Sequence, residues 1–276
     1  MKVTVGIDIG GSTTKIVGFD EEKNLIHPML VKATDPLTSV YGAFGKFTLE
    51  NGLSISNIDK VMITGVGSTY IKDSIYGLKC IHVQEFKSVG LGGLYLSKLK
   101  RAAIVSMGTG TSITYGDFTD GAYSFEYLGG TGVGGGTVSG LASKLFGIGS
   151  TASVVELAKD GDVEKVDLQI KDIAKKDFGL PGNMTAANFG KVDDLATRSD
   201  LAAGLLNLVF ETVAVMARFA AKSCGVSDIV LTGNLTRIPQ CVEKFKELET
   251  LFPERFIIPE NSQFATVIGA ALLADM

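Results

Sequence analysis

The sequence contains few cysteines and histidines, and those it has are scattered. The three cysteines, Cys80, Cys224 and Cys241, form no CxxC pair, and the two histidines, His27 and His82, lack metal-ligand spacing. Disulfide frameworks and zinc sites both need grouped residues, so the sequence encodes neither. We expect a protein of a reducing compartment, and therefore a cytoplasmic one.

A strong net charge and long apolar runs are also missing. The net charge is −4, which gives no strong attraction to nucleic acid or to an anionic membrane. The most apolar stretch, near Leu201 to Ala221, is interrupted by Glu211 and Arg218, unlike a membrane span of about 20 apolar residues. The first residues enter a strand pattern at once, without the features of a secretion signal. We expect a soluble protein that binds small molecules and neither nucleic acid nor membrane.

Glycine, by contrast, is abundant, with 34 residues grouped in short clusters between apolar runs. Val3 to Ile7 and Thr14 to Phe19 are predicted as strands around the turn Asp8-Ile9-Gly10-Gly11-Ser12-Thr13. Ala102 to Phe118 repeats this pattern around Ser106-Met107-Gly108-Thr109-Gly110-Thr111-Ser112. An internal duplication explains the repeat, although strand, glycine turn and strand also recur by chance.

Further helices and strands are predicted on both sides of residue 100. The helices are 39–49, 85–99, 134–145, 201–223 and 264–274, and the strands are 60–64, 80–84, 229–231 and 255–258. This mixture predicts an α/β protein with two lobes, residues 1–100 and 101–276, and a cleft between them. The second lobe is expected to carry a mainly helical insert at about 138–198 and a long helix at about 199–224.

The glycine turns are the first candidates for a ligand site. Glycine lets backbone N–H groups approach a polyanion closely, which suits a phosphate chain. A third turn, Gly129 to Thr137, opens directly onto a helix, and a fourth, Leu231 to Leu235, could let an adenine lie against the backbone. Each alone could be a simple tight turn, and the fourth could be a helix start capped by Asn234 or Thr236. Together they favour a nucleotide site.

Two other nucleotide-binding classes are disfavoured. No Walker A sequence is present, which argues against a P-loop enzyme, and the GxGxxG-like part of the third turn follows no clean parallel strand, which weakens a dinucleotide fold. The residues that we predict to contact the nucleotide are Asp8, Gly10, Gly11, Ser12, Thr13, Lys15, Gly108, Thr109, Gly110, Thr111, Gly132, Gly134, Gly135, Gly136 and Gly233.

Phosphoryl transfer from a nucleotide needs a carboxylate close to the attacking hydroxyl. Glu85 ends an apolar strand and begins a helix, which makes it our first candidate for this base, although a favourable charge at a helix start explains it equally well. Asp8 also ends an apolar strand, where a carboxylate can orient the hydrated Mg²⁺ that accompanies ATP. Glu126 is a third candidate that could simply face solvent. Lys15 and Arg218 could bind phosphate or be solvated.

These motifs resemble those of the type II pantothenate kinases, a branch of the actin-like and sugar-kinase superfamily, over nearly the whole chain. The turns at Asp8 and Gly108 are shared with the superfamily, whereas the stretch Met184 to Gly190 is typical of this branch. The resemblance implies two ribonuclease-H-like lobes with a nucleotide cleft between them. It also implies that Mg-ATP phosphorylates the terminal hydroxyl of pantothenate, the first step of coenzyme A biosynthesis, with Glu85 as catalytic base.

The resemblance further implies substrate contacts and an assembly. The substrate side would be formed by Glu85, Thr109, Tyr127, Gly129 and Gly130. A homodimer would be built partly on the long helix near residues 201–223, whose apolar circumference would equally suit an intramolecular core helix.

Tyr127 departs from the family pattern, which has arginine at this position on the pantothenate side. Arginine offers a bidentate fork for a carboxylate, whereas tyrosine offers one neutral hydroxyl. Ser106 stands where many superfamily members have Asp or Asn, which leaves Asp8 as the principal carboxylate for the metal. Two alternatives therefore stay open: a kinase of the same fold acting on another small hydroxyl acceptor, and a nucleotide-binding regulator that transfers no phosphate.

Overall fold

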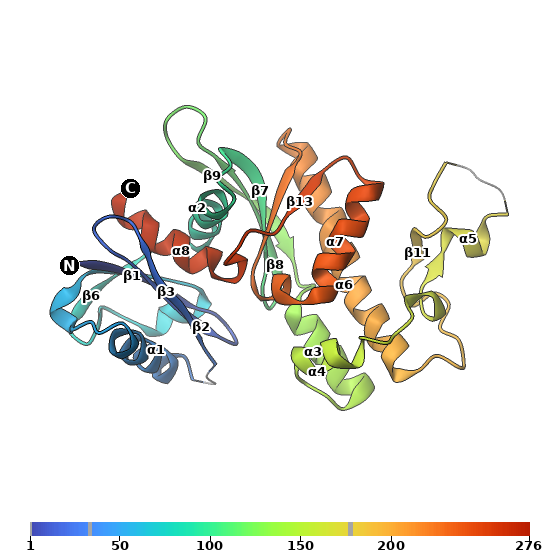
Figure 1. Cartoon of the computed structure of the whole chain (residues 1–276), viewed down its shortest axis with the longest axis horizontal. Helices are drawn as coiled ribbons and strands as arrows, with labels where there is room; N and C mark the ends of the chain where they lie inside the picture. The colour runs from blue at the N-terminus through green and yellow to red at the C-terminus, as the bar shows by residue number, and fades with distance from the viewer. Residues whose placement is uncertain (1, 33–34, 176–178) are drawn as a thin grey trace.

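The computed structural model describes residues 2–32, 35–175 and 179–276, whose longer strands form two sheets (Figure 1). The first sheet has the order β3-β2-β1-β4-β6-β5 and the second the order β13-β12-β7-β8-β9. The strands of the first sheet are β1 (Val3–Ile9), β2 (Thr14–Phe19), β3 (Leu25–Val31), β4 (Ile58–Thr64), β5 (Ser74–Ile75) and β6 (Leu78–His82). Those of the second are β7 (Arg101–Met107), β8 (Thr111–Asp117), β9 (Ser124–Thr131), β12 (Asp228–Thr232) and β13 (Arg255–Ile257).

The two sheets repeat one topology. In each, three consecutive antiparallel strands (β1 to β3, and β7 to β9) are followed by two strands that run parallel to the first of them, and the first sheet adds the short edge strand β5, which is antiparallel to β6. The repeat confirms the internal duplication that the two glycine hairpins predicted. It also places the two hairpin turns, 10–13 and 108–110, at equivalent positions of the two lobes.

Helices cover both faces of each sheet, and two of them cross between the lobes. On the first sheet, α1 (Pro36–Glu50) packs on one face through Val40 and Phe44, and α8 (Ala265–Leu272) packs on the other through Val267. On the second sheet, α2 (Glu85–Ser97) packs on one face, and α3 (Gly135–Phe146), α6 (Arg198–Ser223) and α7 (Pro239–Leu251) contribute to the core on the other. The C-terminal helix thus covers the N-terminal sheet, and α2 covers the C-terminal one (Figure 1).

The crossing of α2 and α8 depends on glycine. A Cβ atom on Gly92 would lie 2.6 Å from the carbonyl carbon of Ala265, and one on Gly269 would lie 2.6 Å from the amide nitrogen of Gly92. The two helix backbones are therefore in direct contact. The next turn of α8 approaches β1 in the same way, because a Cβ on Gly6 would lie 2.9 Å from that of Ala271.

The segment between α3 and α6 differs from the predicted helical insert. It contains α4 (Thr151–Leu157), the four-residue α5 (Ile170–Ile173) and a small sheet of β10 (Leu168–Gln169) and β11 (Thr185–Ala187), and little other regular structure. The expectation of a mainly helical insert is therefore wrong beyond α4; residues 176–178 lie outside the described part. Glycines at 161, 179, 182 and 190 disfavour a long helix there. Figure 1 shows β11 and α5 at one end of the molecule, beyond α6, whereas α4 lies beside α3.

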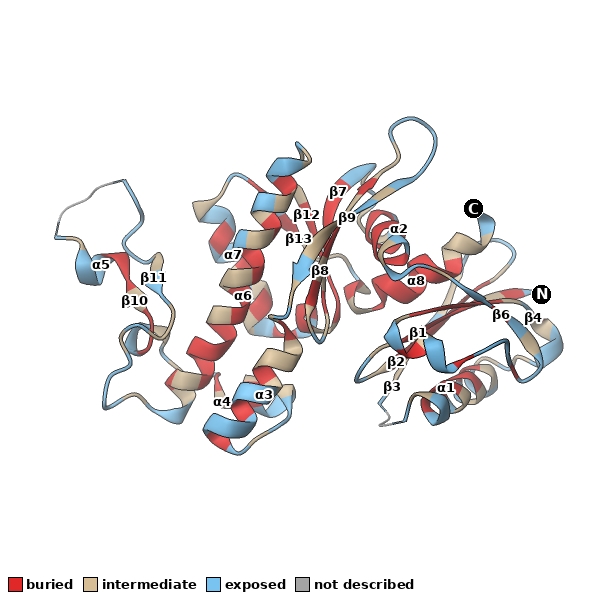
Figure 2. Ribbon diagram, turned by 180° about the vertical axis from the view of Figure 1, so that it is seen from behind, coloured by how far each residue is buried: buried red, intermediate tan, exposed pale blue. Residues whose placement is uncertain are grey.

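α6 is the longest helix and forms part of the second core. Its start is fixed by a capping box in which the Thr197 hydroxyl accepts from the Asp200 amide and the Asp200 carboxylate accepts from the Thr197 amide. By length and composition α6 could cross a membrane, but most of its apolar stretch is buried in this structure (Figure 2). Leu205, Val209 and Val213 join the core formed by the second sheet, and this burial explains their apolar character.

Candidate active site

Three polar residues of the first lobe lie at the carboxyl ends of neighbouring parallel strands. Asp8 near the end of β1 pairs in register with Thr64 at the end of β4, and β6, which runs parallel to β4, ends three residues before Glu85. Ligands of open α/β sheets bind at this edge. The predicted positions of Asp8 and Glu85 at strand ends are thus brought to one edge of one sheet.

Asp8, Glu85 and Lys15 act on one another electrostatically. Lys15 is paired with Asp8 across the β1–β2 hairpin, and both side chains are buried. Burial raises the pKa of Asp8, and the charge of Lys15 partly offsets this rise. Glu85 keeps solvent contact, yet desolvation and the charge of Asp8 raise its pKa, while Lys15 lowers it. Burial lowers the pKa of Lys15, whereas the negative charges of Asp8 and Glu85 raise it. One cation is therefore shared by two carboxylates.

Gly65, which borders Asp8, was not among the predicted site residues. This residue has a φ of 85°, and a Cβ on it would lie 2.6 Å from Oδ1 of Asp8 and 2.5 Å from the carbonyl oxygen of Ile9. Only glycine fits such a conformation so close to a carboxylate. A signal was present: Thr64-Gly65 ends β4 as Thr232-Gly233 ends the equivalent strand β12.

The two hairpin turns face each other across the lobes. Each is closed by a backbone hydrogen bond, from the Gly10 amide to the Thr13 carbonyl (3.0 Å) and from the Gly108 amide to the Gly110 carbonyl (2.9 Å). A Cβ on Gly11 would lie 3.8 Å from the hydroxyl of Thr109. The tips of the two predicted phosphate turns therefore lie so close that a single added Cβ atom would bring them into van der Waals contact.

The third turn braces the second. The Gly135 and Gly136 amides donate to the carbonyls of Gly108 (2.9 Å) and Thr109 (2.8 Å), and the Thr111 hydroxyl donates to the Val133 carbonyl (2.8 Å). These two helix-start amides are thus engaged within the protein, because the helix start lies directly on the second turn. The Gly134 amide likewise donates to the Thr137 hydroxyl, whereas Gly132 is exposed, and a Cβ added to it would meet open space.

The fourth turn completes the group. Gly233 has a φ of 93°, and a Cβ on it would lie 2.6 Å from the carbonyl carbon of Met107, directly before the second turn. Asn234 does not cap a helix with its side chain; its amide group reaches the Thr13 hydroxyl of the first lobe at 3.5 Å. The Asn234 Oδ1 atom is buried without a hydrogen-bond partner. All four glycine turns therefore converge between the two sheets.

Tyr127 lies beside the start of α2. Its ring and that of Phe86 are tilted at 45° with centroids 6.4 Å apart, which places it next to the residue that follows Glu85. Its hydroxyl would lie 3.2 Å from a Cβ on Gly130, one of the predicted substrate-side glycines. The structure thus brings Tyr127, Gly130 and the Glu85–Phe86 pair together.

Two predicted candidates lie elsewhere. Glu126 is exposed, and as the neighbour of Tyr127 on β9 it points to the opposite face of the strand. Arg218 is bound by Glu254 (2.7 Å) and stacks on the ring of Phe252, so it serves the packing of α6.

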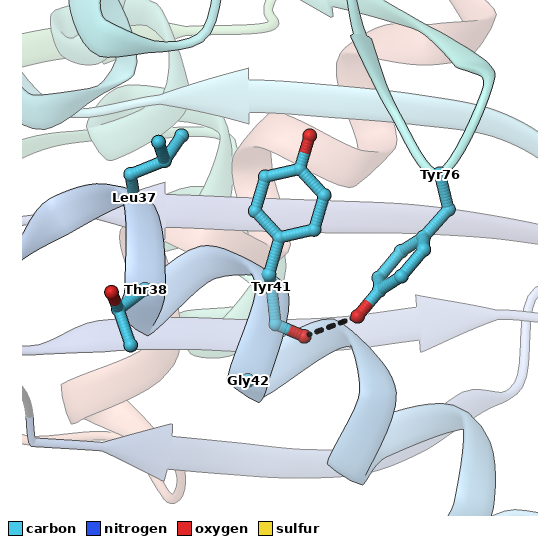
Figure 3. A pocket seen from close by; sticks show the side chains of 5 residues that line it. All are labelled: Leu37, Thr38, Tyr41, Gly42 and Tyr76. Atoms are coloured by element: carbon cyan, nitrogen blue, oxygen red, sulfur yellow. Dashed lines mark hydrogen bonds between the residues drawn. The ribbon is translucent and has the colours of Figure 1, made fainter.

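A surface pocket of about 440 Å³ contains none of the predicted site residues (Figure 3). It is lined by Leu37, Thr38, Tyr41 and Gly42 of α1 and by Tyr76. The Tyr76 hydroxyl donates to the Tyr41 carbonyl (3.3 Å), as Figure 3 shows. The pocket therefore lies along α1, on the face of the first sheet opposite α8.

Comparison with known proteins agrees with this geometry. A family model described as Fumble matches residues 101–245. The type II pantothenate kinase of Oceanobacillus iheyensis is 30% identical over 279 residues, which cover 97% of this chain and 98% of that protein. The chain belongs to the type II pantothenate kinase family. The family assignment made from the glycine turns and from Met184 to Gly190 is confirmed.

Solved structures confirm the fold expected for a member of this family. The activator of the 2-hydroxyisocaproyl-CoA dehydratase from Clostridium difficile, with bound ADPNP, has a TM-score of 0.68 at 17% identity, covering 99% of this chain and 94% of that chain. A ROK family glucokinase from Streptomyces griseus, in complex with glucose and AMPPNP, has a TM-score of 0.58 at 13% identity, with 98% of both chains covered. The fold is that of the actin-like ATPases and sugar kinases.

The stretch that resembled this kinase family most specifically has a structural role here. Buried Asp167 accepts from the Phe189 amide (2.7 Å) and from the side chains of Asn188 (3.2 Å) and Asn207 (2.7 Å). Asn188 also donates to Glu211 of α6 (3.0 Å). This stretch is thereby fastened to α6, directly at Glu211 and through Asp167 at Asn207.

Proposed function

We propose that this chain transfers the γ-phosphoryl group of ATP to the terminal hydroxyl of pantothenate, which begins coenzyme A biosynthesis. The name of its full-length relatives supports the acceptor, and the fold of the nucleotide-bound structures supports ATP. The observation that carries the proposal is the meeting of Asp8, Lys15 and Glu85 at one strand edge that faces four glycine turns.

In this reaction Glu85 is the base. The acceptor oxygen forms a bond to the γ-phosphorus, the bond from that phosphorus to the bridging oxygen breaks, and ADP leaves. Glu85 takes the proton of the acceptor hydroxyl. Its position at the first residue of α2 gives it solvent contact, and its raised pKa makes it a better proton acceptor than an ordinary glutamate.

Asp8 and Lys15 would serve the phosphate side. A buried carboxylate whose pKa is raised by desolvation is stabilised by a cation, so Asp8 fits a role beside Mg²⁺. The described residues include no group of three or more metal-ligating side chains. Asp8 would therefore hold Mg²⁺ together with water and phosphates, which commonly complete its coordination. When bound, Mg²⁺ would neutralise phosphate charge. The turns at 10–13, 108–110 and 233–234 would surround the nucleotide.

Acceptor-dependent ADP release tests the proposal. We expect ADP formation to require pantothenate and Glu85→Gln to reduce turnover about a hundredfold or more, as for a removed general base. Glu126→Gln is the matched comparison, because it changes an exposed glutamate on the outer face of β9. ADP release that does not depend on pantothenate would contradict the function. Loss of turnover in Glu126→Gln but not in Glu85→Gln would contradict the assignment of Glu85 as the base.

A homodimer and a cytoplasmic location are also part of the proposal. Phe219 and Val215 of α6 are 66% and 38% exposed on the outer side of the helix, where a second copy could cover them. Light scattering of Phe219→Glu tests this, since a charge in an apolar interface should yield monomers. The three free cysteines agree with a reducing compartment.

A further inference from the structure

A fifth glycine turn lies at the same strand edge as Asp8 and Glu85. It has the sequence Gly65-Val66-Gly67-Ser68 and follows β4, which lies between β1 and β6 in the first sheet. Thr64 at the end of β4 is paired in register with Asp8, and its hydroxyl donates to the Val83 carbonyl (3.1 Å), just after β6. Asp8, Thr64 and Val83 therefore form one row across three neighbouring chain segments.

Val66 lies between the first phosphate turn and the proposed base. Two residues beyond the row, the chain reaches Gly10, Val66 and Glu85, in the same order across the edge. Phosphoryl transfer to a hydroxyl needs the acceptor oxygen between the γ-phosphate and the base. The carbon atoms next to that oxygen must therefore lie close to the middle position, which is that of Val66.

The backbone of this turn is held against β1, and the Val66 side chain is left outside that packing. A Cβ on Gly65 would lie 2.5 Å from the Ile9 carbonyl oxygen, and one on Gly67 would lie 3.1 Å from the same atom. The Ser68 amide closes the turn by donating to the Gly65 carbonyl (3.0 Å). Since the flanking glycines occupy the side toward β1, Val66 projects into the open edge, and it is 69% exposed.

An exposed valine is an unusual choice for such a turn. Glycine, asparagine, aspartate and serine are the residues that tight turns favour, and valine offers the turn neither a hydrogen bond nor conformational freedom. Its apolar surface is also of no use to the phosphates or to Mg²⁺. The side chain of Val66 therefore suits an apolar part of the acceptor.

The proposed acceptor carries an apolar group at the matching place. In pantothenate, the carbon next to the hydroxymethyl group bears two methyl groups. They enter the site together with the hydroxyl that Glu85 deprotonates, whereas the carboxylate lies at the other end of the molecule. Methyl groups that leave water for an apolar side chain gain free energy through the hydrophobic effect.

We propose that Val66 is a specificity-determining residue, whose side chain packs on the two methyl groups beside the acceptor hydroxyl. The kinase would thus select an acceptor with a quaternary carbon next to its hydroxymethyl group. The turn is held in place for this contact, because Ile71 at its end is 4% exposed and joins the core of the first lobe. This inference rests on the proposed function and specifies which part of the acceptor is recognised.

Tyr70 is the neighbouring residue that could take this role instead. It is 66% exposed and ends the 3₁₀ helix that Val66 begins. Four residues of a 3₁₀ helix advance about 8 Å and turn about 120° around the axis. Tyr70 therefore leaves the helix from another side and farther from the row, and Tyr70→Ser provides a direct test.

The experiment compares two acceptors by ADP release at saturating ATP: pantothenate and the analogue in which hydrogen replaces both methyl groups. For the wild type we expect kcat/KM for pantothenate to exceed that for the analogue by about tenfold or more. Val66→Thr should reduce this ratio by about threefold or more, because a hydroxyl replaces a methyl group in the apolar contact. Val66→Ala, which removes most of the contact, should reduce it at least as much. Both changes are at an exposed position, so the core stays intact.

Val192→Thr is the matched control, because it makes the same change at a valine that is 49% exposed in the segment between α3 and α6. It should keep the wild-type ratio. A general defect lowers both rates together, so only a change in the ratio supports the role of Val66.

Three results would overturn the inference and leave the kinase function intact. The first is a wild type that uses both acceptors equally well, and the second is a Val66→Thr protein that keeps the wild-type ratio. The third is a ratio that Tyr70→Ser or Val192→Thr reduces as far as Val66→Thr does. Turnover of neither acceptor would overturn the proposed function and this inference together.

Discussion

The crossing of α2 and α8 provides a quantitative prediction about stability. At Gly92 a Cβ would lie 2.6 Å from the carbonyl carbon of Ala265, whereas real Cβ atoms essentially never approach another heavy atom within 3.0 Å. The neighbouring atoms are backbone atoms of α8 and cannot rotate away. Gly92→Ala must therefore separate the two helices that link the lobes.

The expected cost follows from two opposing effects. Overpacking of a well-packed core costs about 1–3 kcal/mol, and we expect about 3 kcal/mol because the obstacle is backbone. Alanine in a helix interior returns about 0.5–1 kcal/mol relative to glycine. The net loss in the free energy of unfolding should be about 2 kcal/mol, which lowers Tm by about 4–8 °C for a chain of this size.

Thermal and urea unfolding of two alanine variants measure this effect. Gly42→Ala is the control, because Gly42 lies within α1, is exposed and has no atom within 4 Å of the added Cβ. It should stabilise the protein by about 0.5–1 kcal/mol. The double variant with Gly92→Ala and Gly269→Ala should lose less free energy of unfolding than the two single variants lose together, because both substitutions force α2 and α8 apart at the same contact. A Gly92→Ala protein as stable as Gly42→Ala would refute the reasoning.

Three further predictions concern titrating and buried groups. Lys15→Met should move the acidic limb of the kcat/KM profile to higher pH, because Lys15 lowers the pKa of Glu85 and a base works only when deprotonated; a limb at lower pH would count against the assignment. Asp167→Ala should lower the free energy of unfolding by about 3 kcal/mol, since the buried Asn207 amide and two part-buried donors lose their acceptor, and an unchanged urea midpoint would disprove this. Hydrogen bonds, chiefly the one from the Asp162 amide, lower the pKa of Asp200 to about 2. Its ionised carboxylate therefore stabilises the fold at pH values above 3.8, the ordinary pKa of the group. The destabilisation by Asp200→Asn should therefore shrink as the pH falls from 3.8 toward 2, and an equal loss at every pH would contradict it.

Local patterns were readable in the sequence where one rule applied. Both glycine hairpins were found because alternating apolar strands flank each turn, and α6 was found because its apolar stripe continues for many turns. β9 was missed because Gly129 and Gly130 lie inside it and most of its residues are exposed or half-buried. α7 was missed because it starts at a proline and has a largely polar sequence. The insert was misjudged because its second part, at Asn188 and Phe189, is held by hydrogen bonds to buried Asp167, which lies 21 and 22 residues earlier, and such distant pairs leave no local pattern.

Local pattern and motif were sufficient to predict the two hairpins, the strand-end positions of Asp8 and Glu85, and the family. Which groups meet depends on tertiary contacts. The Gly135 amide is bound by the Gly108 carbonyl, Asn234 reaches Thr13, and Tyr127 lies on Phe86. Each of these contacts joins residues far apart along the chain, and hydrogen-bond partners and packing neighbours at such separations are set by the arrangement of the two sheets.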